Sequence, residues 1–134
     1  MKINSEQEML DFGKEFAKKV EFPMVIELIG DVGAGKTTFT RGLAEGLNAK
    51  EQVTSPSFTI SKSYALPNNK KLIHYDFYRL PDPGLMSEEL NESINDQDAI
   101  TVIEWGESVA GILPEDRIIM KIEYTENGNR IITF

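Results

Sequence analysis

The stretch that most constrains this chain is Gly30-Asp31-Val32-Gly33-Ala34-Gly35-Lys36-Thr37, followed at once by Thr38. Its spacing is G-x-x-x-x-G-K-[ST], and the apolar run 24–29 before it is typical of a strand that leads into such a loop. Glycines let the backbone curl around a phosphate, and the helix that we expect over 39–47 points its positive N-terminal end at the same anion. Lys36 supplies charge for the β and γ phosphates, Thr37 a hydroxyl for Mg²⁺, and Thr38 a further donor. The sequence therefore predicts a nucleotide phosphate site over residues 30–38.

The order of the glycines separates this loop from two other nucleotide-binding loops. Dinucleotide-binding folds and protein kinases use G-x-G-x-x-G, whereas this chain has G-x-x-G-x-G. The Asn-Lys-x-Asp signature of guanine recognition is missing, since Asn69-Lys70 is followed by Lys71-Leu72. We therefore expect a P-loop NTPase that binds ATP.

Composition limits the class of protein and the chemistry. The chain has 134 residues, of which 40% are hydrophobic, so we expect one domain over residues 1–134. No apolar run approaches the roughly 20 residues of a membrane span, which predicts a soluble, cytoplasmic protein. There is no cysteine and one histidine, His74, so any metal should be bound through oxygen.

The charge argues against tight nucleic-acid binding by this chain alone. The net charge is −8, from 22 acidic and 14 basic residues, and the basic residues are scattered. Neutralisation of phosphates normally supplies most of the affinity for nucleic acid. If RNA is involved, we expect a partner to hold it.

The periodicity predicts a mixed α/β sheet with helices on both faces and its parallel part around the strand 24–29. A capping box at residues 5–8 opens a predicted helix over 5–20, and an acidic, helical stretch is expected after residues 81–84. The last two strands, 117–124 and 130–134, should form a closing antiparallel hairpin. The remaining strands are expected over 58–64, 71–75 and 99–103.

Two acidic residues follow β-rich runs and are the candidates for chemistry beside the loop. Asp76 ends one strand and Glu104 another, so both can emerge at the carboxyl edge of the sheet, where ligands of α/β folds bind. With Lys36 they form the predicted catalytic set, and with Thr37 the predicted Mg²⁺ ligands. The alternative is that each simply caps a strand in solvent.

Other residues are assigned to nucleotide binding with less local support. The turn that contains Thr54, Ser55 and Ser57 can close over the γ-phosphate as a switch, or it is an ordinary Ser/Thr/Pro turn. Trp105 can line the site or belong to the core, and Glu6 completes the candidates. We expect His74 to be structural, and Arg79 to pair with Asp76, with phosphate or at the surface.

Several separated motifs together resemble the TsaE (YjeE) family, the small P-loop ATPases of bacterial tRNA threonylcarbamoyladenosine biosynthesis. They are Phe12-Gly13-Lys14, the loop 30–38 with Arg41-Gly42, Thr54-Ser55-Pro56-Ser57-Phe58, His74-Tyr75-Asp76-Phe77-Tyr78-Arg79-Leu80 and Ile103-Glu104-Trp105. The family usually has threonine where this chain has Ser57, which keeps the hydroxyl and loses a methyl group.

The resemblance implies roles and partners. It implies that Lys36 and Thr37 bind phosphate and Mg²⁺, that Asp76 is the Walker-B-like acid and that Glu104 completes the metal or water site. It also implies an accessory ATPase that acts on TsaB and TsaD, the complex that transfers threonylcarbamoyl to adenosine 37 of tRNAs reading codons that begin with A. Two alternatives stay open: a small-molecule kinase with the same loop, and a nucleotide-gated binding module that does not hydrolyse ATP.

Overall fold

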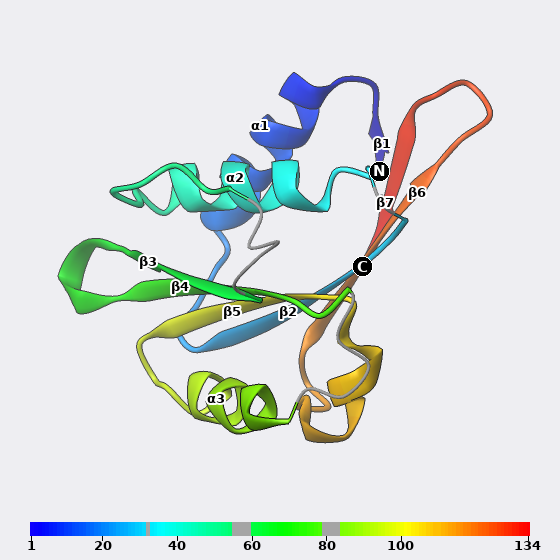
Figure 1. The fold of residues 1–134 in the computed structure, drawn as a ribbon. Helices are drawn as coiled ribbons and strands as arrows, with labels where there is room; N and C mark the ends of the chain where they lie inside the picture. Colours follow the sequence, from blue (N-terminus) through cyan, green and yellow to red (C-terminus); the bar gives the residue numbers. More distant parts are fainter. Residues whose placement is uncertain (32, 55–59, 79–83) are drawn as a thin grey trace.

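The computed structural model describes residues 1–31, 33–54, 60–78 and 84–134. One mixed sheet runs through the molecule in the order β1-β7-β6-β2-β5-β4-β3 (Figure 1). Strands β6, β2, β5 and β4 are parallel neighbours at its centre, while β3 on one side and β7 and β1 on the other are antiparallel. The strands are β1 (Lys2–Ile3), β2 (Met24–Ile29), β3 (Ser61–Ala65), β4 (Lys71–Asp76), β5 (Ala99–Glu104), β6 (Ile118–Tyr124) and β7 (Arg130–Thr133).

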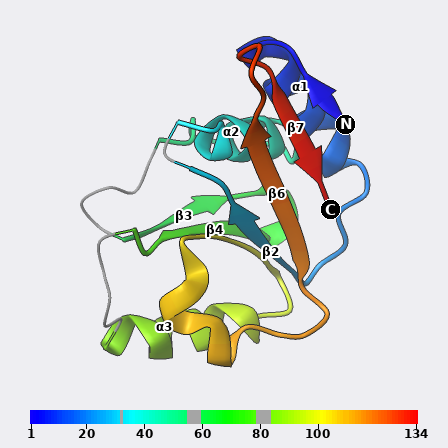
Figure 2. The same ribbon diagram turned by 90° about the vertical axis from the view of Figure 1, so that its right-hand side faces the viewer.

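Helices cover both faces of this sheet. Helices α1 (Glu6–Ala17) and α2 (Lys36–Gly46) lie on one face, and α3 (Leu85–Ile94) with the 3₁₀ segment η2 (Gly106–Ile112) on the other (Figures 1 and 2). Side chains alternate along each strand, so β2 sends Ile26 and Leu28 into the core under α1 and α2, and Val25 into the core at α3. The short 3₁₀ turn η1 (Pro67–Asn69) joins β3 to β4.

The predicted architecture is confirmed, with differences at the ends of elements. Helix α1 begins after the Ser5 cap, whose hydroxyl accepts the Glu8 N–H at 3.1 Å, and it ends at Ala17 rather than at residue 20. Helix α2 begins at Lys36, three residues earlier than predicted, because Gly35 takes a left-handed φ of 108° and the helix starts directly from the loop. Part of the strand predicted over 58–64 falls outside the described residues.

Strand β1 was not predicted. It has only two residues, and its pairing with β7 gives it its conformation. The amino group of Met1 also donates to the Ile132 carbonyl at 2.9 Å. None of the helices in the described part of the chain has the length and apolar content of a membrane span.

Helices α1 and α2 pack closely against each other at Gly13 of α1 and Gly42 of α2. A Cβ built on Gly42 would lie 2.3 Å from the Leu10 carbonyl oxygen, and one on Gly13 would lie 2.6 Å from the Phe39 carbonyl oxygen. The two backbones therefore touch with no side chain between them. This contact fixes the position of α2, and with it the start of the loop.

We predict that Gly42→Ala lowers the free energy of unfolding by about 1–3 kcal/mol, the usual cost of overpacking. The clash should outweigh the gain of about 1 kcal/mol in helix propensity that alanine brings. Chemical denaturation measures the change. Gly111→Ala is the control, because a Cβ there meets nothing within 4 Å. Equal unfolding free energies for Gly42→Ala and the wild type would contradict the contact.

Candidate nucleotide-binding site

The register of three parallel strands builds the edge at which the site lies. Leu28 of β2 pairs with Glu104 of β5, and Glu104 pairs with Asp76 of β4, so the three residues form one row across the sheet. Residues of a row point to the same face, and Leu28 belongs to the core under α1 and α2. Both carboxylates therefore emerge on the face of α2, beside Gly30, which follows β2.

The predicted phosphate loop joins β2 to α2 and depends on two left-handed glycines. Gly33 has a φ of 82° and Gly35 a φ of 108°, values that residues with a Cβ rarely adopt. The Ala34 N–H donates to the Asp31 carbonyl at 3.0 Å, which closes a turn inside the loop. Thr37 and Thr38 lie in the first turn of α2, as predicted, while Val32 lies outside the described residues.

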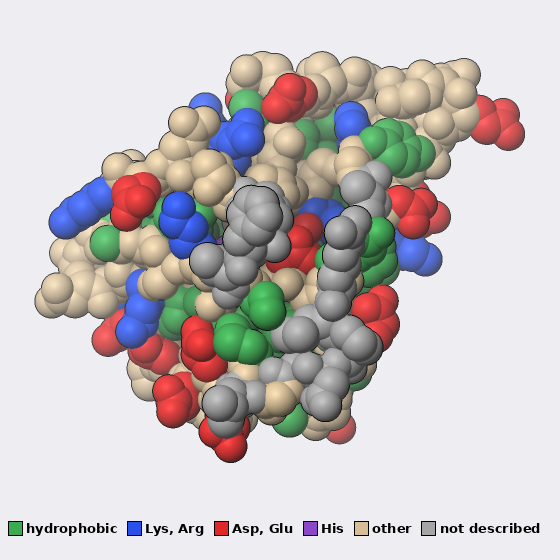
Figure 3. Space-filling view, in the orientation of Figure 1, with side chains coloured by type: hydrophobic (Ala, Val, Ile, Leu, Met, Phe, Trp, Pro, Cys, Tyr) green, Lys and Arg blue, Asp and Glu red, His purple; other side chains and the backbone are tan. Residues whose placement is uncertain are grey.

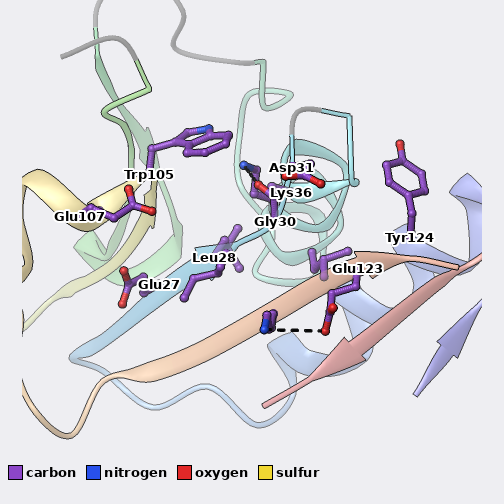
Figure 4. Close-up of a pocket in the computed structure, with 13 residues that line it drawn as sticks. Glu27, Leu28, Gly30, Asp31, Lys36, Trp105, Glu107, Glu123 and Tyr124 are labelled. Atoms are coloured by element: carbon purple, nitrogen blue, oxygen red, sulfur yellow. Dashed lines mark hydrogen bonds and ion pairs between the residues drawn. The ribbon is translucent and has the colours of Figure 1, made fainter. Parts of the chain in front are cut away.

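Lys36 is buried at the centre of the site, with 5% of its surface exposed. Its Nζ donates to the Gly30 carbonyl at 2.6 Å, lies 4.0 Å from Glu104 Oε1 and is 3.9 Å from the centre of the Trp105 ring. Figure 4 shows the Lys36 and Trp105 side chains facing each other. Loss of solvation lowers the pKa of Lys36, against the opposing pull of nearby carboxylates, Glu104 first and Asp76 next.

Glu104 is held on two sides. It is 3% exposed, one carboxylate oxygen faces Lys36, and the other is hydrogen-bonded to His74 Nε2. His74 itself is fully buried, and its Nδ1 has no hydrogen-bond partner within the described residues. The sequence interpretation of His74 as structural missed this contact with the site. The available signal was spacing, because His74 and Asp76 are two residues apart on one strand and so share a face.

Asp76 stands beside Glu104 and is partly buried. Its Oδ1 accepts the Tyr78 N–H at 2.9 Å. Burial is the main reason that the pKa of Asp76 is raised, and the neighbouring Glu104 carboxylate raises it further. The surroundings of Asp76 therefore favour its neutral form more than water does.

A cavity of about 410 Å³ opens beside the loop. In Figure 4 Glu27 and Glu107 lie on one side of it, Lys36 and Asp31 at the loop, and Tyr124 on the far side. Glu27 is engaged already, because the Arg117 Nε donates to its Oε1 at 2.9 Å. The lining consists of Glu27, Leu28, Ile29, Gly30, Asp31, Lys36, Trp105, Gly106, Glu107, Lys121, Ile122, Glu123 and Tyr124. Sequence reasoning had not assigned the β6 residues to the site.

Of the predicted nucleotide-binding residues, Gly30, Asp31, Lys36 and Trp105 line the cavity, and the other described ones, Thr54 and Glu6 among them, do not. The N–H and carbonyl groups of Thr54 are both hydrogen-bonded to the Tyr64 hydroxyl at 3.2 Å. The Glu6 carboxylate pairs with Arg41 at 3.6 Å, and 69% of the Glu6 side chain is exposed. Their roles in binding stay predictions. Ser55, Ser57 and Arg79 lie outside the described residues.

The oxygen donors at the edge suit Mg²⁺ when it is bound together with phosphate. Thr37, Asp76 and Glu104 offer a hydroxyl and two carboxylates, with no sulfur ligand. Within the described part of the chain, no three His, Cys, Asp or Glu side chains are grouped to hold a metal by themselves. Mg²⁺ typically takes one or two carboxylates and completes its shell with phosphate oxygens and water. The donor set fits that pattern.

We predict that Asp76→Asn stabilises the nucleotide-free protein at pH 7 in the presence of a chelator. A raised folded-state pKa means that the ionised carboxylate opposes folding, so the stability of the wild type falls as the pH rises through that pKa. The amide oxygen can still accept the Tyr78 N–H. Thermal melts should show the advantage of the variant at pH 7 and its loss below the ordinary carboxyl pKa of 3.8. If the variant is less stable than the wild type at pH 7, the raised pKa of Asp76 is refuted.

Comparison with known proteins agrees with this geometry. A family model described as threonylcarbamoyl adenosine biosynthesis protein TsaE matches residues 3–132. The tRNA threonylcarbamoyladenosine biosynthesis protein TsaE of Haemophilus influenzae is 38% identical, over 96% of this chain and 84% of that relative. The protein of the same name from Bacillus subtilis is 42% identical, over 82% of this chain and 68% of the relative. The crystal structure of Bacillus subtilis YdiB superposes with a TM-score of 0.79 at 32% identity, over 98% of this chain and 80% of that one, which confirms the single-domain α/β fold. The chain belongs to the TsaE family.

Proposed function

We propose that this protein binds and hydrolyses ATP with Mg²⁺ in the cytoplasm, and is required for formation of the threonylcarbamoyl group at adenosine 37 of tRNAs reading codons that begin with A. Its relatives are named as tRNA threonylcarbamoyladenosine biosynthesis proteins, which supports the pathway. The observation that carries the ATPase is the row that sets Glu104 and Asp76 beside the phosphate loop, with the Lys36 Nζ 4.0 Å from Glu104.

Each residue of the site has a distinct role in ATP binding or hydrolysis. Lys36, whose Nζ donates to the Gly30 carbonyl at 2.6 Å, supplies its charge to oxygens of the β and γ phosphates. Thr37, through its hydroxyl, and Asp76, through its carboxylate, would hold Mg²⁺, which would neutralise phosphate charge when bound with ATP. Glu104 orients the attacking water, and its hydrogen bond to the buried His74 keeps its carboxylate at the edge of the sheet.

The protein acts on the TsaB–TsaD complex and not directly on tRNA in this proposal. The support is electrostatic, since the net charge is −8 and tight tRNA binding needs a basic surface. On the face drawn in Figure 3, acidic and basic side chains of the described residues are interspersed, with no basic surface formed among them. The nucleotide cycle then changes the state of the partner complex, as nucleotide-driven switches do.

We predict that Lys36→Ala and Glu104→Gln each lower multiple-turnover tRNA modification by about 100-fold or more. Lys36→Ala removes the charge that binds phosphate, and Glu104→Gln leaves an amide that is a poor base for water. The assay supplies TsaB, TsaD, the other pathway proteins, tRNA and ATP, and it measures both modified tRNA and released inorganic phosphate. Glu115→Gln, an exposed carboxylate outside the cavity, is the control.

The same variants separate the alternatives. Full turnover by Lys36→Ala and Glu104→Gln would refute the proposal. If Glu104→Gln supports modification without releasing phosphate, the protein is a nucleotide-gated binding module. A phosphorylated metabolite in place of inorganic phosphate would identify a kinase.

A further inference from the structure

The C-terminal hairpin of β6 and β7 braces the phosphate loop at each of its three glycines. A Cβ on Gly30 would lie 2.6 Å from the Ile122 carbonyl oxygen, and one on Gly33 would lie 3.3 Å from the Tyr124 hydroxyl. One on Gly35 would lie 3.0 Å from the Met9 Cε of α1 and 3.4 Å from the Arg130 Nε. The loop and the hairpin are about 90 residues apart in sequence, as the separation of 91 between Gly33 and Tyr124 shows. The tertiary fold therefore gives the loop a wall that its own sequence does not supply.

Two side chains of this hairpin converge on one carbonyl of the loop. The Tyr124 hydroxyl donates to the Gly33 carbonyl oxygen, and the Arg130 Nη2 donates to the same oxygen at 3.2 Å. Arg130 Nη2 also donates to the Tyr124 hydroxyl at 3.3 Å, and its guanidinium lies 4.9 Å from the centre of the Tyr124 ring. Tyr124, Arg130 and the Gly33 carbonyl therefore form a closed triangle of contacts, which we term the Gly33 clamp.

The hairpin is suited to hold this clamp. Tyr124 is the last residue of β6, Arg130 is the first residue of β7, and the two are directly paired in the antiparallel register. β6 is in turn a parallel partner of β2, the strand that leads into the loop. Figure 4 shows Tyr124 on the side of Lys36 away from Trp105. Neither clamp side chain belongs to the proposed chemistry.

We infer that Tyr124 and Arg130 are positioning residues that hold the loop in its phosphate-binding shape before the nucleotide arrives. Gly33 sits at a φ of 82°, and glycine loses more conformational freedom on ordering than any other residue. An anchored Gly33 carbonyl removes part of that loss from the binding step, which raises affinity by pre-organisation. This inference rests on the proposed function, because it concerns the same nucleotide site.

The test compares three variants by titration with a fluorescent ADP analogue. Tyr124→Phe keeps the ring and removes the hydroxyl, and Arg130→Met keeps much of the stem and removes the guanidinium. Each should weaken binding about 3- to 10-fold, the range expected for one hydrogen bond. Arg130→Lys retains a donor and should bind more tightly than Arg130→Met, whereas a packing role alone predicts that the two are alike. Glu126→Gln, at the exposed tip of the hairpin, is the matched control.

Two further readouts separate positioning from general stability. Hydrogen exchange of the nucleotide-free protein should become faster at the loop 30–36 in Tyr124→Phe and Arg130→Met, and stay unchanged in β4 and β5. The KM for ATP should rise by the same factor as the dissociation constant, while kcat stays within about twofold of the wild-type value. This pattern is expected because the lost contacts stabilise bound ATP and the transition state equally. Wild-type affinity and wild-type exchange in Tyr124→Phe and Arg130→Met would overturn the inference and leave the proposed function intact. Absence of nucleotide binding by the wild type would overturn both.

Discussion

The parallel pairing of β2, β5 and β4 is the constraint on which the rest of the site depends. It sets Leu28, Glu104 and Asp76 in one row, so the last residues of β4 and β5 face α2 next to the loop that follows β2. A slip of one residue in either pairing would turn a carboxylate to the α3 face and replace it with an apolar neighbour. The buried, apolar strands enforce the register, because every residue of β5 is buried and such a slip would exchange its contacts with both cores.

The site places one buried cation close to several carboxylates. One buried lysine stands among the carboxylates of Glu104, Asp76, Asp31 and Glu107, and burial lowers the pKa of this lysine while it raises the pKa of Asp76. Lys36 donates a hydrogen bond to the Gly30 carbonyl and makes a cation–π contact with the Trp105 ring. Phosphate offers it a stronger partner but adds negative charge beside two carboxylates. The proposed Mg²⁺ would offset that added charge, and hydroxyl and carboxylate oxygens are the donors that suit it.

Local patterns were enough for much of the fold and for the centre of the site. The loop 30–38 depends on contiguous residues, and Asp76 and Glu104 each end an apolar run that can be recognised as a strand. The ends of α1 and α2, the strand β1 and the contact of His74 with Glu104 could not be found in this way. β1 exists through its pairing with β7, and the role of His74 requires knowing that β4 lies beside β5. The proposed roles of Thr54 and Glu6 stay predictions, and the structure adds only that the Thr54 backbone is hydrogen-bonded to Tyr64 and that the Glu6 carboxylate pairs with Arg41.

The sequence by itself determined that this protein has a phosphate loop between a strand and a helix, two acidic candidates for it, and an α/β sheet that ends in a hairpin. These features follow from residue type and spacing, which act over a few positions. Only the tertiary structure decided which groups surround the loop: the His74–Glu104 contact, the approach of Lys36 to Trp105, and the Gly33 clamp of Tyr124 and Arg130. Those contacts join residues that are distant along the chain, so strand order and register decide them, and no local pattern encodes either one.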